Sequence, residues 1–333
     1  MERALRGNPV RAVMSTAAML RQCVEAAMLA PSLHNSQPWR FRIDDGAVEV
    51  FADRTRQLEV LDPDGRELMI SLGAAVFTLR AAMRGEGWIP AVSLLPDPGS
   101  LDLVARVRPD RPESPSPAAK RLAAAIGQRH TNRGPFTAAA VAAHAIEDLR
   151  AAAEHEGATL TVAGPASRTT IIGLGRLAEQ RLRAGGGYFA ELGRWTRPAP
   201  GRRDGIPAVA IGPWDALERL PLRDFGLVHP QPSRRLERFE AYPTIAVLTT
   251  QGDQPADWLR AGQALQRVLL VATGLHLATT PISQPVEVPT VRQVLSDPRR
   301  GRWAQMVVRL GYGQPAPATP RRLLDDVLRE APA

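Results

Sequence analysis

The stretch APSLHNSQPWRF, residues 30–41, places polar side chains and two prolines directly after an apolar segment of helical periodicity. That segment, from about residue 15 to residue 30, predicts a helix with Ser15 or Thr16 as its N-cap. Beyond the stretch, apolar residues and arginines alternate, DDG supplies a turn, and AVEVF alternates again. This pattern predicts two adjacent antiparallel strands, so the polar stretch is a loop between a helix and a sheet.

The composition of the chain bounds the class of protein. With 333 residues, 44% of them hydrophobic, it can bury the core of one large domain or of two modest ones. Its one cysteine, Cys23, occupies an apolar position of the first helix, which excludes an internal disulfide and favours a reducing cytoplasm. No apolar run is long enough for a membrane span, and residues 1–14 lack the apolar core of a signal peptide, so we expect no membrane partner.

The net charge of +8 raises the question of nucleic-acid binding. Lys120 is the only lysine, and the arginines are spread from Arg3 to Arg329 with acidic residues between them. A nucleic-acid site needs basic residues clustered on one face, whereas interleaved charges are typical of solvated surfaces. We therefore expect a small-molecule substrate and no nucleic-acid partner.

The order of predicted elements indicates the fold class. Periodicity over residues 66–85 predicts a long helix, and another is expected over about 138–155. Residues 109–117, PDRPESPSP, are rich in proline and serine, which is typical of an exposed linker. Helices and strands alternate irregularly, with adjacent strand pairs beside strand–helix pairs, and this favours an α+β fold over a doubly wound sheet.

One segment, residues 185–232, lacks a regular pattern and is dense in Gly, Pro, Arg and isolated Trp. Such a length exceeds that of an ordinary connection, which predicts a functional flap or lid. A structural wrap around the core is an equal alternative.

Common catalytic and metal-binding motifs are missing from the sequence. Gly173, Gly175 and Ala178 match G-x-G-x-x-A, but no strand ending in an acid follows, so we interpret them as positions of close packing in a helix. The six histidines show no metal-ligand spacing, and no hydrolase elbow or phosphate-binding loop is present. We therefore predict no metal site and name no catalytic residue.

Three further segments share one chemistry. In QRHTNRGPF, residues 128–136, Arg129 could bind a phosphate and Arg133 could face an electron-rich ring, although a solvated basic turn is the alternative. GLHLATTPISQP, residues 274–285, supplies a polar tip after a long helix, and TPRR, residues 319–322, adds adjacent arginines. Together with the polar stretch they fit a phosphorylated, flat ligand with polar edges.

In this order, these segments resemble the nitroreductase-like flavoproteins, most closely their Acg-type branch, over about residues 14–330. In ordinary nitroreductases two shorter subunits pair, and FMN lies between them. The resemblance implies that residues 1–108 and 118–333 are two nitroreductase-like halves, joined by the linker 109–117, with 185–232 as a lid insertion. Each half keeps one complementary set of motifs, which implies an intrachain pseudo-dimer with one FMN per chain. Whether the chain is a monomer or a homodimer stays open.

The resemblance carries the FMN site over residue by residue. The matched positions are Ser32, Asn35, Gln37, Arg129, His130, Thr131, Arg133, Ser283, Gln284, Arg321 and Arg322. The first three would reach the cofactor from the first half, and the rest belong to the second half. His34, inside the same polar stretch, receives no role.

The family pattern also implies what these residues do. Arg129 and one or both of Arg321 and Arg322 would bind the FMN phosphate, and the two residues after Arg129 would lie near the ribityl chain or the ring edge. Arg133 would face the pyrimidine edge of the ring, where its charge stabilises the anion that forms on reduction. A backbone N–H near Ser283 or Gln284 would face flavin N5, although the family often has other residues there.

The function implied is that of an FMN-dependent oxidoreductase. NAD(P)H or another donor would reduce the flavin, which would pass hydride to a nitro compound or quinone. The alternative is an FMN-binding or sequestering protein in which residues 185–232 form a closed lid.

Overall fold

The computed structural model describes residues 15–329 of the chain. Residues 1–14 and 330–333, the outer ends of the two predicted halves, lie outside this range. Ser15 caps the first helix as predicted, and its hydroxyl accepts a hydrogen bond from the backbone N–H of Ala18 at 3.2 Å.

The first part of the chain surrounds a five-stranded sheet. Its elements are α1 (Thr16–Ala27), β1 (Trp39–Asp44), β2 (Ala47–Ala52), α2 (Arg66–Gly85), β3 (Trp88–Leu94), β4 (Leu103–Pro112), α3 (Pro117–Ala125) and, from the far end of the chain, β11 (Leu328–Arg329). The strand order is β11-β1-β2-β4-β3. β1 and β2 form the predicted antiparallel hairpin, and β11 pairs in parallel with β1. The end of the chain thus completes the sheet that its beginning builds.

A second, antiparallel sheet of four strands has the order β5-β8-β10-β9. The elements of this part are α4 (Ala143–Glu154), β5 (Ala158–Val162), α5 (Pro165–Ala184), β8 (Thr244–Thr250), α7 (Pro255–Gly274), β9 (Ala278–Ile282), α8 (Gln284–Glu287), α9 (Pro289–Leu295) and β10 (Trp303–Gly311). The short helix α10 (Leu324–Val327) comes later in the chain and packs with β11 on the first sheet. Residues of α4 and α7 pack on one face of this sheet, while Ile171 of α5 and Val286 of α8 pack on the other. The whole is an α+β fold, as the sequence predicts.

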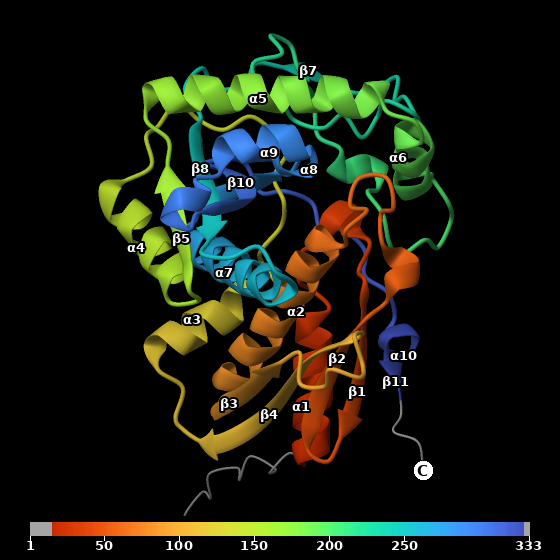
Figure 1. The fold of residues 1–333 in the computed structure, drawn as a ribbon, viewed down its shortest axis with the longest axis vertical. Coiled ribbons are helices and arrows are strands. Elements are labelled where there is room, and N and C mark those ends of the chain that lie inside the picture. Colours follow the sequence, from red (N-terminus) through yellow and green to blue (C-terminus); the bar gives the residue numbers. More distant parts are fainter. Residues whose placement is uncertain (1–14, 330–333) are drawn as a thin grey trace, which may run out of the picture.

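The long helices α2 and α7 lie side by side in the middle of the molecule (Figure 1). Gly73 of α2 and Gly262 of α7 lie where they cross. A Cβ atom on Gly73 would lie 2.2 Å from the backbone oxygen of Leu259, and one on Gly262 would lie 2.0 Å from that of Ile70. The two backbones can approach this closely only because both residues lack a side chain.

α2 contributes to the hydrophobic cores of both large sheets. Leu72 and Leu79 belong to the core of the first sheet, and Ile70 belongs to that of the second. By length and composition the helix could span a membrane, but 78% of its apolar window is buried in the fold. It is therefore a core helix.

Residues 109–112 belong to β4 and not to a linker, so the structure corrects the predicted linker of residues 109–117. Trp88 of β3 pairs with Pro112, whereas β2 pairs with β4 only up to Val107. Beyond that point β4 has a neighbour on one side only, where proline is tolerated because no second partner needs its missing N–H. Residues 113–116 remain as the connection to α3.

The 185–232 segment contains regular structure that its composition hides. α6 (Tyr188–Thr196) is a helix, and the segment also holds the short strand β6 (Trp214–Asp215), which pairs with β7 (Leu236–Glu237). Tyr188, Leu192 and Trp195 are buried together on one helical face. α4 begins at Ala143, later than predicted. The G-x-G-x-x-A residues lie inside α5, as interpreted, but close packing holds only in part: a Cβ atom on Gly175 would lie 2.6 Å from the Pro221 side chain, whereas one on Gly173 would meet nothing within 4 Å.

The helix crossing predicts the effect of adding single methyl groups. Gly262→Ala should lower the free energy of unfolding by about 1–3 kcal/mol or more, because the added Cβ would overlap a backbone oxygen. Gly173→Ala, inside α5 with nothing within 4 Å of the added Cβ, is the control and should leave stability equal or slightly higher. Denaturant midpoints measure both, and equal midpoints for the two variants would contradict close contact at the crossing.

Candidate functional site

Two neighbouring cavities, which share lining residues, lie between the two parts of the chain. The wide cavity holds about 810 Å³ of empty space, open solvent included, and the narrow cavity about 360 Å³. Pro31, Ser32, Thr131 and Arg133 line both of them. The polar stretch of residues 30–41 and the arginine loop of residues 128–136 therefore meet in space, as the sequence analysis expects of a shared site.

The narrow cavity is lined by cationic side chains. Arg129 is 4% exposed; its Nη2 donates to the backbone oxygen of Leu29 at 3.2 Å, and its Nε has no partner among residues 15–329. Arg321 donates to Asn35 Oδ1 at 3.0 Å and to Thr319 Oγ1 at 2.6 Å. Neither arginine has a carboxylate partner in the part of the chain that the structure describes.

The pKa values of these groups show that their charges are unfavourably placed without an anion. Burial and the nearby Arg321 lower the pKa of Arg129 to about 9, and burial lowers that of Arg321 to about 10. Burial, Arg129 and Arg321 also lower the pKa of His130, which lines the same cavity. Buried cationic side chains without acidic partners favour the binding of a phosphate or another anion, because the anion supplies the missing negative charge.

A buried ion pair fixes the position of the arginine loop, residues 128–136. Arg309, with 0% exposure, donates to Glu240 through Nε and Nη2, each at 2.6 Å. Glu240 also accepts from the backbone N–H of Phe136 at 3.0 Å, and Arg309 Nη1 donates to the Gly134 oxygen at 3.0 Å. The Arg309 guanidinium lies 3.6 Å from the centre of the Phe136 ring. The loop is thus rigidly positioned, by two residues that the sequence analysis missed.

Strand β9 fixes the middle of the same loop. The backbone N–H of Asn132 donates to the Thr279 oxygen at 2.9 Å, and Thr280 Oγ1 donates to the Asn132 oxygen at 2.5 Å. Asn132 therefore faces the strand, while its neighbours Thr131 and Arg133 line the cavities.

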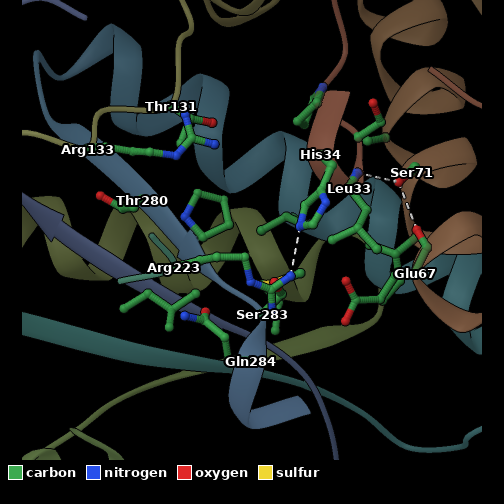
Figure 2. Close-up of a pocket in the computed structure, with 18 of the residues that line it drawn as sticks. Leu33, His34, Glu67, Ser71, Thr131, Arg133, Arg223, Thr280, Ser283 and Gln284 are labelled. Carbon is green, nitrogen blue, oxygen red and sulfur yellow. Dashed lines mark hydrogen bonds between the residues drawn. The ribbon is translucent and has the colours of Figure 1, made fainter. Parts of the chain in front are cut away.

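Residues from three parts of the chain line the wide cavity (Figure 2). The first part of the chain supplies one wall, the second part another, and the 185–232 segment a third. The lining includes Ser32, His34, Glu67 and Ser71 from the first part, Thr131, Arg133, Thr280, Ser283 and Gln284 from the second, and Leu222, Arg223 and Phe225 from the segment.

Arg133 and Arg223 bring positive charge to this cavity. Arg133 Nη1 donates to the Ala210 oxygen at 3.0 Å, and its guanidinium lies 4.8 Å from the centre of the Phe225 ring. Burial and Arg223 lower the pKa of Arg133 to about 10. Arg223, by contrast, forms a buried ion pair with Glu287. Of these two arginines, Arg133 is therefore the one left with charge to offer a ligand.

Glu67 is an acidic residue in the wall that sequence analysis missed. One of its oxygens accepts from Arg66 at 2.7 Å, and the other has no partner among residues 15–329. Burial and the nearby Glu287 raise the pKa of the Glu67 carboxyl well above its usual range. Its place in α2, inside an apolar helical pattern, gave no sequence signal beyond a charged residue on a buried face.

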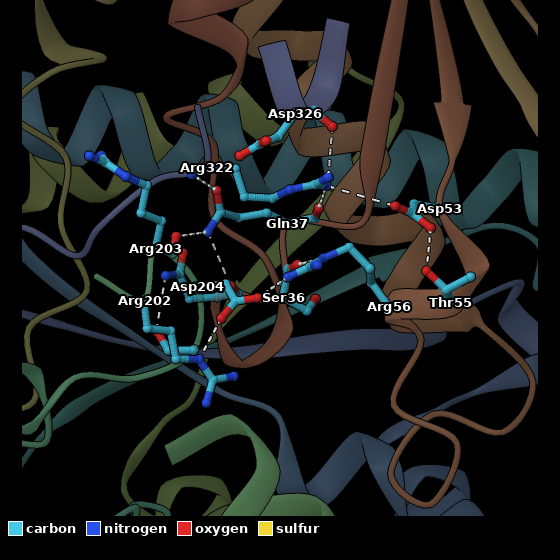
Figure 3. Close-up of polar contacts among 12 residues, drawn as sticks. Ser36, Gln37, Asp53, Thr55, Arg56, Arg202, Arg203, Asp204, Arg322 and Asp326 are labelled. Carbon is cyan, nitrogen blue, oxygen red and sulfur yellow. Dashed lines mark hydrogen bonds and ion pairs between the residues drawn. The ribbon is translucent and has the colours of Figure 1, made fainter. Parts of the chain in front are cut away.

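Gln37 and Arg322, both predicted site residues, lie outside the two cavities (Figure 3). Gln37 Nε2 donates to the Arg203 oxygen at 2.8 Å, and its Oε1 accepts from the Arg322 N–H at 2.9 Å. The Arg322 guanidinium lies 3.8 Å from a carboxylate oxygen of Asp53. These two residues join the polar stretch to the 185–232 segment and to the end of the chain.

One ion pair and several hydrogen bonds anchor the 185–232 segment to both parts of the chain (Figure 3). Arg56 forms an ion pair with Asp204 and donates to the Ser36 oxygen at 2.5 Å. Asn35 Nδ2 donates to the Gly205 oxygen at 2.9 Å, and Gln284 Nε2 donates to the Pro221 oxygen at 2.9 Å. The segment is therefore held at several points around the wide cavity.

Comparison with known proteins finds relatives in Mycobacterium tuberculosis strain H37Rv. One, "Uncharacterized protein Rv3127", is 34% identical over 322 residues, which are 93% of each chain. "Putative NAD(P)H nitroreductase Rv3131" is 33% identical, covering 93% of this chain and 90% of the relative. "Putative NAD(P)H nitroreductase acg" is 31% identical, covering 94% and 96%. No family model matches the chain.

Solved structures of nitroreductases match part of the chain. NfnB from Mycobacterium smegmatis, an FMN-dependent nitroreductase in complex with NADPH, is 17% identical with a TM-score of 0.38, over 65% of this chain and 98% of its own. A nitroreductase with bound FMN from Bacteroides fragilis is 13% identical with a TM-score of 0.36, over 61% and 93%. TM-scores this low do not establish a shared fold by themselves.

Binding of an anion in the narrow cavity should raise the pKa of His130. An anion between Arg129 and Arg321 would offset their repulsion of the imidazolium, so His130 should titrate closer to the ordinary value of 6.5. NMR titration with and without inorganic phosphate measures the shift, and the exposed His155 reports any general effect of the salt. A pKa of His130 that does not change at saturating phosphate would place the anion elsewhere.

Proposed function

Because this chain belongs to the nitroreductase-like FMN family, in its acg branch, we propose that it binds FMN across the two cavities. We further propose that it is an FMN-dependent oxidoreductase, taking electrons from NAD(P)H or another donor and passing them to a nitro compound or quinone. The observation that carries the proposal is the pair of arginines without acidic partners among residues 15–329, Arg129 and Arg321, in a narrow cavity that shares four lining residues with a wider one.

The residues of the narrow cavity fit the phosphate of FMN. The partnerless Nε of Arg129 offers a charge-assisted hydrogen bond, and Arg321 and His130 add donors on the same cavity wall. A phosphate bound there would supply the negative charge that burial of these groups requires. Thr131 and Ser32, which line both cavities, would lie beside the ribityl chain that joins phosphate to ring.

The wide cavity fits the ring. FMN, when bound, supplies the hydride chemistry, and the protein supplies placement and electrostatics. Arg133, which lines both cavities and has no acidic partner in residues 15–329, would stabilise negative charge on the pyrimidine edge of the ring. Ser283 and Gln284, at the start of α8, would lie against the opposite part of the ring.

We infer that the two parts of the chain form an intrachain pseudo-dimer. The pairing of α2 with α7, the two cores that meet there, and the return of β11 to the first sheet support this inference. Both parts contribute walls to one pair of cavities, so one chain provides a complete site for one FMN. A second copy of the chain is then not needed for cofactor binding.

A second candidate function is FMN sequestration with little turnover. It is favoured by Leu222, Arg223 and Phe225, which place the 185–232 segment in the wall of the wide cavity. A nicotinamide must reach one face of the flavin ring, and a closed segment would prevent that. The two functions share one cofactor site and differ in whether the segment opens.

Arginine substitutions should separate the phosphate site from its surroundings. Arg129→Ala and Arg321→Ala should each weaken FMN binding by about 1.5 to 3 kcal/mol, the usual cost of losing a charged hydrogen-bond partner. Arg322→Ala is the control, because that residue lies outside both cavities and should have a smaller effect. Quenching of FMN fluorescence measures affinity, and the wild type should saturate at one FMN per chain. If Arg322→Ala proved as harmful as Arg321→Ala, the phosphate would lie elsewhere.

Loosening the 185–232 segment should distinguish turnover from sequestration. Arg56→Gln removes the ion pair with Asp204 without touching either cavity, and Arg54→Gln removes only an exposed pair with Asp102. Anaerobic reduction of the bound flavin by NADPH or NADH is followed by loss of its visible absorbance. Reduction of the wild type supports the oxidoreductase, whereas reduction of Arg56→Gln alone supports a closed lid. If no variant is reduced, a nicotinamide is not the donor.

A further inference from the structure

His34 is the member of the polar stretch whose role the sequence leaves open. Its side chain is 4% exposed and forms part of the wall of the wide cavity. The ring nitrogen Nε2 lies 2.7 Å from Nη1 of Arg223. A dashed line marks this contact in Figure 2. Phe225 meets the imidazole edge-on, with 5.0 Å between ring centres. Two residues of the 185–232 segment therefore fix the orientation of this ring.

The contact with Arg223 determines which ring nitrogen carries the proton. A guanidinium has donors only, so Nε2 must be the acceptor of this hydrogen bond. The proton of the neutral imidazole is then on Nδ1. Nδ1 is buried and has no hydrogen-bond partner among residues 15–329. His34, a residue that lines the wide cavity, thus carries a buried neutral N–H donor without an acceptor in the described part of the chain.

The charges around the ring keep His34 neutral. Burial, Arg223 and Arg133 lower its pKa well below the ordinary value. Glu67 of α2 lines the same cavity and pairs with Arg66 at 2.7 Å, and burial and Glu287 raise the pKa of its carboxyl.

The backbone around this ring adopts an unusual conformation. His34, Asn35 and Gln37 have positive φ angles of 49°, 55° and 51°, in the left-handed region that residues other than glycine rarely occupy. Such conformations cost free energy and persist where the surroundings hold them, most often at ligand sites. Hydrogen bonds from Asn35 to Gly205 and from Gln37 to Arg203 hold this one.

A buried donor without an acceptor is costly unless a ligand supplies one. We propose that Nδ1–H of His34 donates a hydrogen bond to an acceptor atom of the flat ligand in the wide cavity, which makes His34 a neutral positioning residue. This inference rests on the proposed function. The acceptor atom belongs either to the flavin ring or to a quinone or nitro compound bound against it, and both offer an oxygen acceptor.

The protonation state of His34 can be measured without turnover. In ¹⁵N-labelled protein, NMR correlation of ring nitrogens with carbon-bound protons distinguishes the two neutral forms and the imidazolium, and the His34→Asn variant assigns the signals. We expect Nδ1 to be protonated and Nε2 bare from about pH 6 to 8, with or without FMN. A proton on Nε2, or an imidazolium in this range, would overturn the proposal.

A matched pair of substitutions tests the ligand contact. The amide of His34→Asn can place a donor where Nδ1 lies, whereas that of His34→Gln reaches the position of Nε2. Both variants lose the imidazole ring, so they are compared with each other: His34→Gln should bind the ligand about three- to tenfold more weakly than His34→Asn, as expected for one lost hydrogen bond.

Two readouts identify the ligand. A raised dissociation constant for FMN in His34→Gln alone assigns the contact to the flavin, and a raised KM for para-benzoquinone with unchanged FMN affinity assigns it to the acceptor. Equal behaviour of the two variants in both assays would overturn the contact. If the protein binds no FMN at all while NMR still shows the proton on Nδ1, the proposed function fails and the tautomer assignment stands.

Discussion

The crossing of α2 and α7 at Gly73 and Gly262 is the contact on which the rest of the structure depends. Each glycine brings the backbone of one helix against a backbone oxygen of the other, closer than any side chain would allow. This contact joins the two hydrophobic cores, since Ile70 of α2 belongs to the core of the second sheet and Leu259 of α7 to that of the first. The two parts are thereby held at one separation, and the polar stretch and arginine loop meet at one pair of cavities.

Electrostatics distinguishes the candidate site from the rest of an arginine-rich surface. Two other deeply buried arginines have acidic partners, Arg309 with Glu240 and Arg223 with Glu287, and those pairs position loops. Arg129, Arg133 and Arg321 line the cavities without such partners among residues 15–329. A partly buried positive charge without a negative partner is unfavourable until an anion binds. Because these arginines are already in position, little conformational entropy is lost when an anion binds to them.

The 185–232 segment connects structure to chemistry. Its apolar face packs on the first part of the chain, where Tyr188 and Trp195 share a core with Leu58. Its later residues, Arg223 and Phe225, form a wall of the wide cavity and orient His34. A structural wrap and a lid were equal alternatives from the sequence. The segment packs on the first part of the chain, as a wrap would, and it also lines the wide cavity, as a lid would. Arg56 and Asp204, whose ion pair anchors the segment, line neither cavity, so loosening of the segment can be tested separately from binding.

The amino-acid sequence alone was enough to predict the α+β class, the first hairpin and the bounds of the long helix at 66–85. It also identified the segments that meet at the site. These features could be predicted because periodicity and local motifs depend on residues that are near neighbours in the chain. Tertiary structure decided what depends on distant partners. Residues 109–112 form a strand because β3 pairs with them. Gln37 and Arg322 lie outside the cavities, where they hydrogen-bond to each other. Glu67, Arg223 and His34 acquired their roles from burial and charge across the interface, which no local pattern records.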